Sequence, residues 1–291
     1  MTRQHALISI HLAAVLFGLT GIFGELIGAD AGVITAGRAA FAVLALLLFM
    51  RWQGSSACAG INTRDILVLS SAGIMLAVHW VTFFLAVKIS GVAIATLGFA
   101  SFPAFITLCE WLVLREKVSR AEWVILLLVT AGLVLVTPSF DFRDDATIGL
   151  GWAITSGLSF ALFTIINRKA AAHLSAYQVA CWENLVVVLV TLPFSFTGFA
   201  AIGAIDWFWL ALLGIFCTAL SHFLLVSSLN VLNARSAGIV IALEPVYAIF
   251  FAAVLFAQYP GFRAIIGGAI MIAAIVWSGL RKQERNPEVG Q

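Results

Sequence analysis

Long, uninterrupted apolar runs dominate the chain, each about 16 to 25 residues long and bounded by charged residues, glycine, proline or asparagine. An α-helix needs this length to cross the hydrocarbon core of a bilayer. Runs such as VLALLLFM do not alternate between apolar and polar residues, as the strands of a membrane barrel would. With 62% hydrophobic and 10% charged residues, the chain has too little polar surface for a soluble globule. The sequence therefore predicts an all-α integral membrane protein.

Ten apolar spans can be placed along the chain. They cover residues 7–27, 32–50, 65–87, 92–114, 122–137, 149–168, 176–198, 205–229, 234–258 and 262–280. The first span lacks the small-residue cleavage site of a signal peptide, so we expect it to be retained as a helix. An even number of spans predicts that both termini lie on the same side of the membrane.

The distribution of positive charge predicts which side that is, because cytoplasmic loops carry the excess of Lys and Arg. The loops on the side of the termini contain Arg3, Arg51, Arg64, Arg115, Lys117, Arg120, Arg168, Lys169, Arg235, Arg281, Lys282 and Arg285. The opposite loops contain only Lys88, Arg143 and Arg263. Twelve basic residues against three predict that both termini are cytoplasmic.

Several classes of function lack support in the sequence. We find no HExxH, GxSxG, Walker or GxGxxG motif and no Cys/His cluster with metal-binding spacing. The loops are too short for a soluble catalytic domain, and three of the four cysteines lie inside spans. The net charge of +2 reflects the loop bias and is no sign of nucleic-acid binding. We therefore expect no catalytic residue, metal, cofactor or nucleic-acid partner.

The connector SFDFRDDATIG, residues 139–149, divides the chain after five spans into two halves, residues 1–140 and 141–291. Because five is odd, a second half that repeats the first must be inserted in the opposite orientation. A shift of 142 residues places Pro103 on Pro245 and Glu116 on Gln258, within and at the end of the fourth span of each half. The sequence thus predicts ten transmembrane helices arranged as two inverted five-helix repeats.

The two prolines lie inside apolar spans, where proline removes a backbone hydrogen bond and opens the helix. Within a bilayer the freed polar groups are tolerated only beside other protein or a water-filled cavity. Paired interruptions in two inverted halves are typical of a substrate site at the middle of the membrane. We interpret Pro103 and Pro245 as such a site; a purely structural kink is the alternative.

Together these features resemble the drug/metabolite transporter superfamily, specifically its ten-helix EamA-type exporters. The resemblance covers the whole chain and is carried by LEPVYAIFFAAVLFAQ in the ninth span, SFPAFITLCEWLVLREKVS in the fourth, Arg38 and the Gly-rich first span. One departure is Gln258. The family commonly has a Glu at the end of the proline-containing helix in both halves, and here only Glu116 keeps it. The resemblance implies export of amino acids or other small metabolites across a bacterial inner membrane, and His79 among aromatic residues is most similar to the YddG-type amino acid exporters.

Ionisable groups inside a span usually face the protein interior and have a partner. His79 shares a polar helix face with Ser71 and Thr82 and would bind a substrate carboxylate, carry a proton or bond a neighbouring helix. Glu244 would bind a substrate ammonium or, protonated, bond carbonyls freed beside the proline. The candidate substrate-binding residues are His79, Thr82, Phe99, Ser101, Phe163, His222 and Glu244.

A second group of residues is assigned to helix breaking and gating: Pro103, Pro245, Arg38, Gly18 and Gly21. The guanidinium of Arg38 would hold a substrate carboxylate, but we favour an ion pair with Glu25 or Asp30 in an outer gate. The glycines permit close helix packing or sliding between the halves. Elsewhere, Glu183 and Asn184 would line a cavity or fasten two helices together, and we favour fastening.

The hypothesis that follows is a carrier, a monomer or weak homodimer, that exports a small zwitterionic metabolite by alternating access at a midplane cavity. Efflux of a drug or lipophilic cation is the first alternative, because Glu244 and aromatic walls also suit a cation. A membrane enzyme acting on lipid is the second, and it lacks a nucleophile motif. The sequence leaves proton coupling and uncoupled transport equally open.

Overall fold

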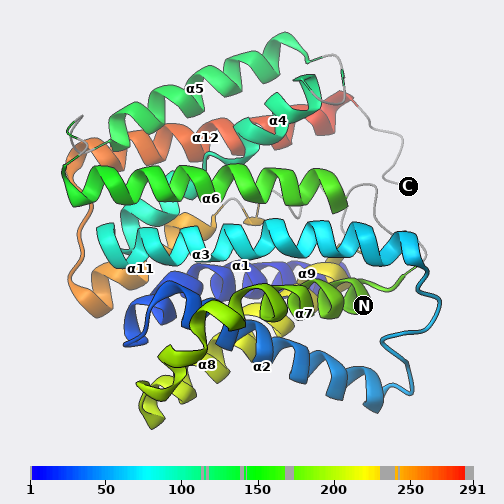
Figure 1. The fold of residues 1–291 in the computed structure, drawn as a ribbon. Helices are drawn as coiled ribbons and strands as arrows, with labels where there is room; N and C mark the ends of the chain where they lie inside the picture. The colour runs from blue at the N-terminus through cyan, green and yellow to red at the C-terminus, as the bar shows by residue number, and fades with distance from the viewer. Residues whose placement is uncertain are drawn as a thin grey trace.

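The structure of the protein is a computed structural model that describes residues 2–112, 115, 118–137, 141, 143–167, 174–229, 240–241 and 243–285. Throughout these residues the regular structure is helical (Figure 1). The first half of the chain contains α1 (Arg3–Leu26), α2 (Ala31–Trp52), α3 (Thr63–Phe99), α4 (Phe102–Leu112) and α5 (Arg120–Val136).

The second half contains α6 (Asp145–Asn167), α7 (Ala176–Ser195), α8 (Ala204–Gly214), α9 (Ser221–Leu229), α11 (Glu244–Phe256) and α12 (Phe262–Arg285). A 3-10 segment, η1 (Phe196–Ala200), extends α7, and a π-helical segment, η2 (Ile215–Leu220), joins α8 to α9. Within the ninth predicted span, residues 234–258, the structure describes residues 240–241 and 243–258. The helix α11 begins at Glu244 in this span.

Six helical stretches of the described residues are long and apolar enough to cross a membrane, and they cover 4–26, 31–52, 63–99, 145–167, 176–200 and 204–225. The apolar helices at 102–112, 244–256 and 262–277 are shorter. The chain is therefore a multi-pass membrane protein, as its composition indicates. The total of ten helices and their inverted arrangement stay predictions.

Polar caps set where several helices begin. The side chain of Asn62 accepts from the backbone N–H of Asp65, and the Asp65 carboxylate accepts from the backbone N–H of Asn62, each at 3.0 Å. Ser119 and Ser175 form the same reciprocal box at the starts of α5 and α7. These contacts satisfy backbone donors that the first turn leaves unpaired, so the short polar segments between apolar runs define helix starts.

The third and fourth predicted spans differ from the observed elements. Gly91 has φ 79° and ψ 168°, a conformation that only glycine adopts readily, and helical geometry resumes after it up to Phe99. The helix then breaks at Ala100 and Ser101, and α4 begins at Phe102. The fourth span, predicted as one helix over 92–114, is thus two segments separated by a break in the middle of the apolar run.

Helices from the two halves pack against each other throughout the bundle. In Figure 1, α5 and α12 lie together along one side, with α6 and α3 adjacent to each other in the middle. On the other side α2 packs on α7, and α1 packs on both α11 and α9. The largest cluster of buried apolar side chains draws on α1, α2, α3, α6, α7, α8, η2 and α11, and it includes Phe84 and Leu213. Both halves of the chain therefore build this cluster.

Candidate functional site

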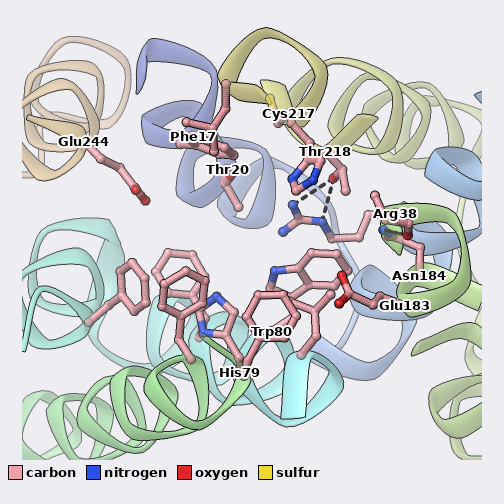
Figure 2. A pocket seen from close by; sticks show the side chains of 18 of the residues that line it. Phe17, Thr20, Arg38, His79, Trp80, Glu183, Asn184, Cys217, Thr218 and Glu244 are labelled. Atoms are coloured by element: carbon pink, nitrogen blue, oxygen red, sulfur yellow. Dashed lines mark hydrogen bonds between the residues drawn. The ribbon is translucent and has the colours of Figure 1, made fainter. Parts of the chain in front are cut away.

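A cavity of about 260 Å³ lies inside the bundle (Figure 2). This volume is just below the range of about 300 to 1,000 Å³ typical of sites for drug-sized ligands. Its lining residues come from both halves of the chain. They are Phe17, Thr20, Arg38, Leu46, Leu76, His79, Trp80, Phe83, Phe99, Phe102, Phe160, Phe163, Ala180, Glu183, Asn184, Cys217, Thr218, His222, Leu225, Ile241 and Glu244.

Two interrupted helices start at this cavity. The first residues of α4 and α11 are Phe102 and Glu244, both cavity-lining, and each is followed directly by the proline of the predicted pair, Pro103 or Pro245. A proline in the first helical turn replaces a backbone donor that would have no helical partner, so it is tolerated there. The start of α11 also carries the positive end of the helix dipole, which favours the carboxylate of Glu244.

The guanidinium of Arg38 is held in place from one side only. Its Nε and Nη2 donate to Thr218 Oγ1 at 3.1 and 2.8 Å, and the Thr218 hydroxyl donates in turn to Leu213 O at 3.0 Å. The guanidinium carbon lies 4.0 Å from the centre of the Trp80 ring, close enough for a cation–π contact. The buried Nη1 has no hydrogen-bond partner among the described residues. The Nη1 nitrogen of Arg38, a residue that lines the cavity, is therefore free to donate to a ligand.

The ion pair that we favoured for Arg38 is absent from this conformation. Glu25 accepts through Oε1 from Gln258 Nε2 at 3.3 Å, and Asp30 accepts through Oδ1 from the backbone N–H of Val33 at 2.9 Å. The Arg38 partner is instead the hydroxyl of Thr218, presented by the π-helical segment η2. In this conformation Asp30 is used as a helix cap and Glu25 bonds the segment after α11, so an ion pair of Arg38 in an outer gate stays a prediction.

His79 is fixed by α6 beneath the cavity. Its Nδ1 lies 2.7 Å from Ser156 Oγ and 3.2 Å from Ser156 O, and the Ser156 hydroxyl donates to His79 O at 3.1 Å. The rings of Phe99 and Phe160 each lie 5.0 Å from the imidazole, centre to centre. His79 thus has both an interhelical bond and a face on the cavity.

Aromatic rings from α4, α6 and the end of α3 form one wall. The rings of Phe99 and Phe102 stack with centres 5.1 Å apart, and Phe160 meets Phe102 edge-on at the same separation. Phe163 continues the wall, 5.7 Å from Phe160. Such a wall excludes water from the polar groups opposite and suits an apolar side chain of a ligand.

Of the predicted site residues, His79, Phe99, Phe163, His222, Glu244 and Arg38 line the cavity. Two others do not. Thr82 donates to Val78 O at 2.7 Å and to His79 O at 3.1 Å, so its hydroxyl is used within its own helix. Ser101 donates to Gly98 O at 2.7 Å and sits in the break between α3 and α4. The assignment of Thr82 and Ser101 to substrate binding is therefore corrected.

The predicted glycines lie at helix contacts. A Cβ on Gly18 would come within 2.9 Å of Tyr247 Cβ, and a Cβ on Gly21 within 3.0 Å of Val92 Cγ1. Gly18 therefore permits the close approach of α1 to α11, and Gly21 that of α1 to α3. Glu116, the residue predicted to correspond to Gln258, lies outside the described residues.

The sequence analysis missed several lining residues. Trp80 and Thr218, which contact Arg38, were not singled out as site residues; a tryptophan next to His79 in a span is the signal that was available. Glu183 and Asn184 both line the cavity, which was the second of the two roles considered for them, and Asn184 Nδ2 donates to Ala180 O of its own helix at 2.8 Å. Both Glu183 Oε1 and Asn184 Oδ1 are buried without a hydrogen-bond partner among the described residues. These oxygens add two free acceptors to residues that line the cavity.

The described residues contain no group of three or more His, Cys, Asp or Glu side chains that could hold a metal ion. The described part of the cavity therefore offers hydrogen-bonding and charged groups at an apolar wall. Such an arrangement suits the binding of a small polar solute.

Comparison with known proteins places the chain in a family. The model of the EamA-like transporter family matches twice, over residues 4–137 and 147–280. The chain belongs to this family. As an EamA-type member of the drug/metabolite transporter superfamily, it is a transporter rather than an enzyme, which sets aside the alternative of a lipid-acting enzyme.

Several EamA-type relatives match over most of their length. The transporter YetK of Bacillus subtilis is 24% identical, with 97% of this chain and 89% of the relative covered. The pseudopaline exporter CntI of Pseudomonas aeruginosa is 24% identical, with 82% of each chain covered. The S-adenosylmethionine uptake transporter of Rickettsia prowazekii is 23% identical, with 81% of this chain and 79% of the relative covered. The last two relatives are named for different substrates and for opposite directions of transport.

A solved crystal structure shares the fold. It superimposes with a TM-score of 0.69 at 16% sequence identity, over 97% of this chain and 99% of the other. The likeness extends over nearly the whole of both chains and concerns the fold alone.

Proposed function

We propose that this EamA-type transporter is a ten-helix carrier of the bacterial inner membrane that exports a small zwitterionic metabolite of the amino acid class. The substrate would bind in the cavity between the two halves, which would expose it to each side of the membrane in turn. Both termini would be cytoplasmic, in agreement with the basic residues of the loops.

The observation that carries this proposal is the separation of opposite charges across the cavity. In Figure 2, Arg38 and Glu244 reach the cavity from opposite sides, with His79 between and below them. The free Nη1 of Arg38 suits a carboxylate, and the carboxylate of Glu244 suits an ammonium. A zwitterion satisfies both groups at once, whereas a simple anion or cation would leave one of them unpaired in an apolar surrounding.

The packing between helices supports two inverted halves, residues 1–140 and 141–291. Two of the contacts between the halves have a counterpart with the halves exchanged: α3 packs on α6 as α9 packs on α1, and α4 packs on α6 as α11 packs on α1. In the proposed repeat α2 corresponds to α7 and α5 to α12, so the contacts of α2 with α7 and of α5 with α12 are unchanged when the halves are exchanged. Such exchange is expected of an inverted repeat and favours rocking of one half against the other.

The test is uptake of radiolabelled amino acids by proteoliposomes that contain the purified protein. We expect wild type to transport at least one amino acid, and Glu244→Gln to lose most of that uptake because the ammonium partner loses its charge. Glu110→Gln is the matched control, since Glu110 belongs to α4 but does not line the cavity. Absence of uptake for every amino acid, or equal loss in both variants, would contradict the proposal. Comparing uptake with and without a proton gradient decides whether transport is coupled.

Efflux of a lipophilic cation is the second candidate, favoured by the aromatic wall beside Glu244. The nearby guanidinium of Arg38 opposes it, because a second positive charge would enter an apolar cavity unpaired. Transport of tetraphenylphosphonium that survives in Arg38→Lys but fails in Glu244→Gln would support this candidate over the zwitterion.

A further inference from the structure

We propose that His79 accepts a hydrogen bond from the amine of the substrate, because Ser156 fixes the imidazole with its proton on Nδ1. The site then takes zwitterions whose nitrogen still carries an N–H and rejects quaternary betaines. The substrate part of this inference rests on the proposed function, whereas the state of the ring does not.

The contacts of Nδ1 decide the position of the proton. A carbonyl oxygen only accepts hydrogen bonds, so the 3.2 Å contact from Nδ1 to Ser156 O requires a proton on Nδ1. The Ser156 hydroxyl donates its single hydrogen to His79 O at 3.1 Å, which makes Ser156 Oγ an acceptor for the 2.7 Å contact with Nδ1. Both contacts lead to the same assignment. A neutral ring protonated on Nδ1 has an acceptor lone pair on Nε2.

The surroundings hold the ring in this orientation. Ser156 is fully buried, and its carbonyl also accepts from Ser159 Oγ at 3.0 Å. The rings of Phe99 and Phe160 lie on the imidazole, so turning it over would break both bonds to Ser156 and displace aromatic packing. Nε2 has no hydrogen-bond partner among the described residues, and the side chain lines the cavity. It remains available to a ligand.

The consequence for the substrate is a reversal of the role that the sequence suggested for His79. A carboxylate placed at Nε2 would face a lone pair, whereas an N–H of an ammonium group can donate to it. The carboxylate of the substrate binds at Arg38 Nη1 instead, and the ammonium group of the substrate lies between Glu244 and His79. A trimethylammonium group has no N–H and leaves Nε2 unpaired, although the aromatic wall would accept its charge.

The state of the ring can be measured on the whole protein. Nitrogen-15 NMR of histidine-labelled protein in lipid bilayers separates the two neutral tautomers and the imidazolium, and His79→Gln assigns the signal by its loss. We expect the Nδ1–H tautomer at neutral pH. A proton on Nε2, or a doubly protonated ring, would overturn the inference whether or not any amino acid is transported.

The substrate part is tested with alanine and its N-methyl, N,N-dimethyl and N,N,N-trimethyl derivatives as competitors of amino acid uptake. The last two differ by one methyl group, but only the dimethyl compound keeps an N–H. We expect apparent affinity to fall at least about tenfold from the dimethyl to the trimethyl compound, as for loss of a hydrogen bond to a charged group. A gradual decrease with size along the series would contradict it.

His79→Asn separates the two acceptors of the amine. Asparagine keeps a donor near the position of Nδ1 for Ser156 but has no atom at the position of Nε2. We expect the difference between the dimethyl and trimethyl compounds to shrink toward equality in this variant. A difference that stays as large as in wild type would mean that Glu244 alone recognises the N–H, and would overturn the role of His79.

Discussion

The side-chain amide of Gln258 donates from Nε2 to Glu25 Oε1 at 3.3 Å and so joins the segment that follows α11 to the end of α1. The same amide accepts through Oε1 from the backbone N–H of Val92 at 3.2 Å, just after the kink at Gly91. One glutamine therefore links three helices at one end of the bundle. A glutamate at this position would lack the amide N–H that donates to Glu25.

Gln258→Glu is expected to weaken this link, because two carboxylates would face each other where an amide now donates. We expect a lower melting temperature of the purified protein at neutral pH. Adding Glu25→Gln should restore most of the loss, since the amide and the carboxylate are then exchanged. A double variant as unstable as the single one would contradict the pairing.

Arg38→Lys is expected to reduce apparent substrate affinity at least about tenfold, because the single nitrogen of lysine cannot reach both Thr218 and a carboxylate at the position of Nη1, as the guanidinium fork can. The measurement is the concentration dependence of amino acid uptake in proteoliposomes. Arg51→Lys is the matched control, since Arg51 lies exposed at the far end of the same helix. Equal effects of the two substitutions would argue against a carboxylate site at Arg38.

Gly18→Ala is expected to destabilise the protein by about 1 to 3 kcal/mol, as overpacking of a close contact does. The added methyl would lie 2.9 Å from Tyr247 Cβ and 3.1 Å from both Ala248 N and Glu244 O. Thermal unfolding in detergent measures the effect. Gly151→Ala in α6 is the control, because a Cβ there meets nothing within 4 Å. A stable Gly18→Ala protein would show that α1 and α11 separate without cost.

Thr82→Val and Ser101→Ala are expected to leave substrate affinity within about twofold of wild type, since the side chains bond their own chain segment and lie off the cavity. Losing such a local hydrogen bond costs about 0.5 to 1.5 kcal/mol of stability. Uptake kinetics and thermal unfolding on the same preparations separate the two effects. A large loss of affinity with unchanged stability would return these residues to the binding site.

The sequence was sufficient for the membrane class and for the region of the cavity. Apolar run length requires helices, and prolines inside those runs require a place where backbone groups are satisfied. Pro103 and Pro245 are the second residues of α4 and α11, and the first residue of each helix lines the cavity. Local sequence rules carry this information because the relevant forces act over a few residues.

Side-chain partners were beyond those rules. Arg38 donates a hydrogen bond to Thr218, which lies 180 residues away in the π-helical segment η2. No local sequence pattern predicts this segment. A charged residue suggested a charged partner, but a hydroxyl and an aromatic face hold it instead. Likewise, the helical face of His79 predicted a cavity for Thr82 as well, although a threonine can satisfy its hydroxyl on the preceding turn. Arg38 was decided by a long-range contact, whereas Thr82 was decided by a choice between two acceptors, the cavity or its own helix, that the pattern of the sequence leaves open.

The packing of α3 on α6, α2 on α7 and α5 on α12 crosses the midpoint of the chain. Each half therefore buries its apolar faces mainly against the other, and neither has a complete interior of its own. A polypeptide divided between α5 and α6 should be held together by this interlocked packing rather than by the peptide connection. Two fragments made in the same cell would then find each other in the membrane, whereas either fragment alone would have nothing to fold against.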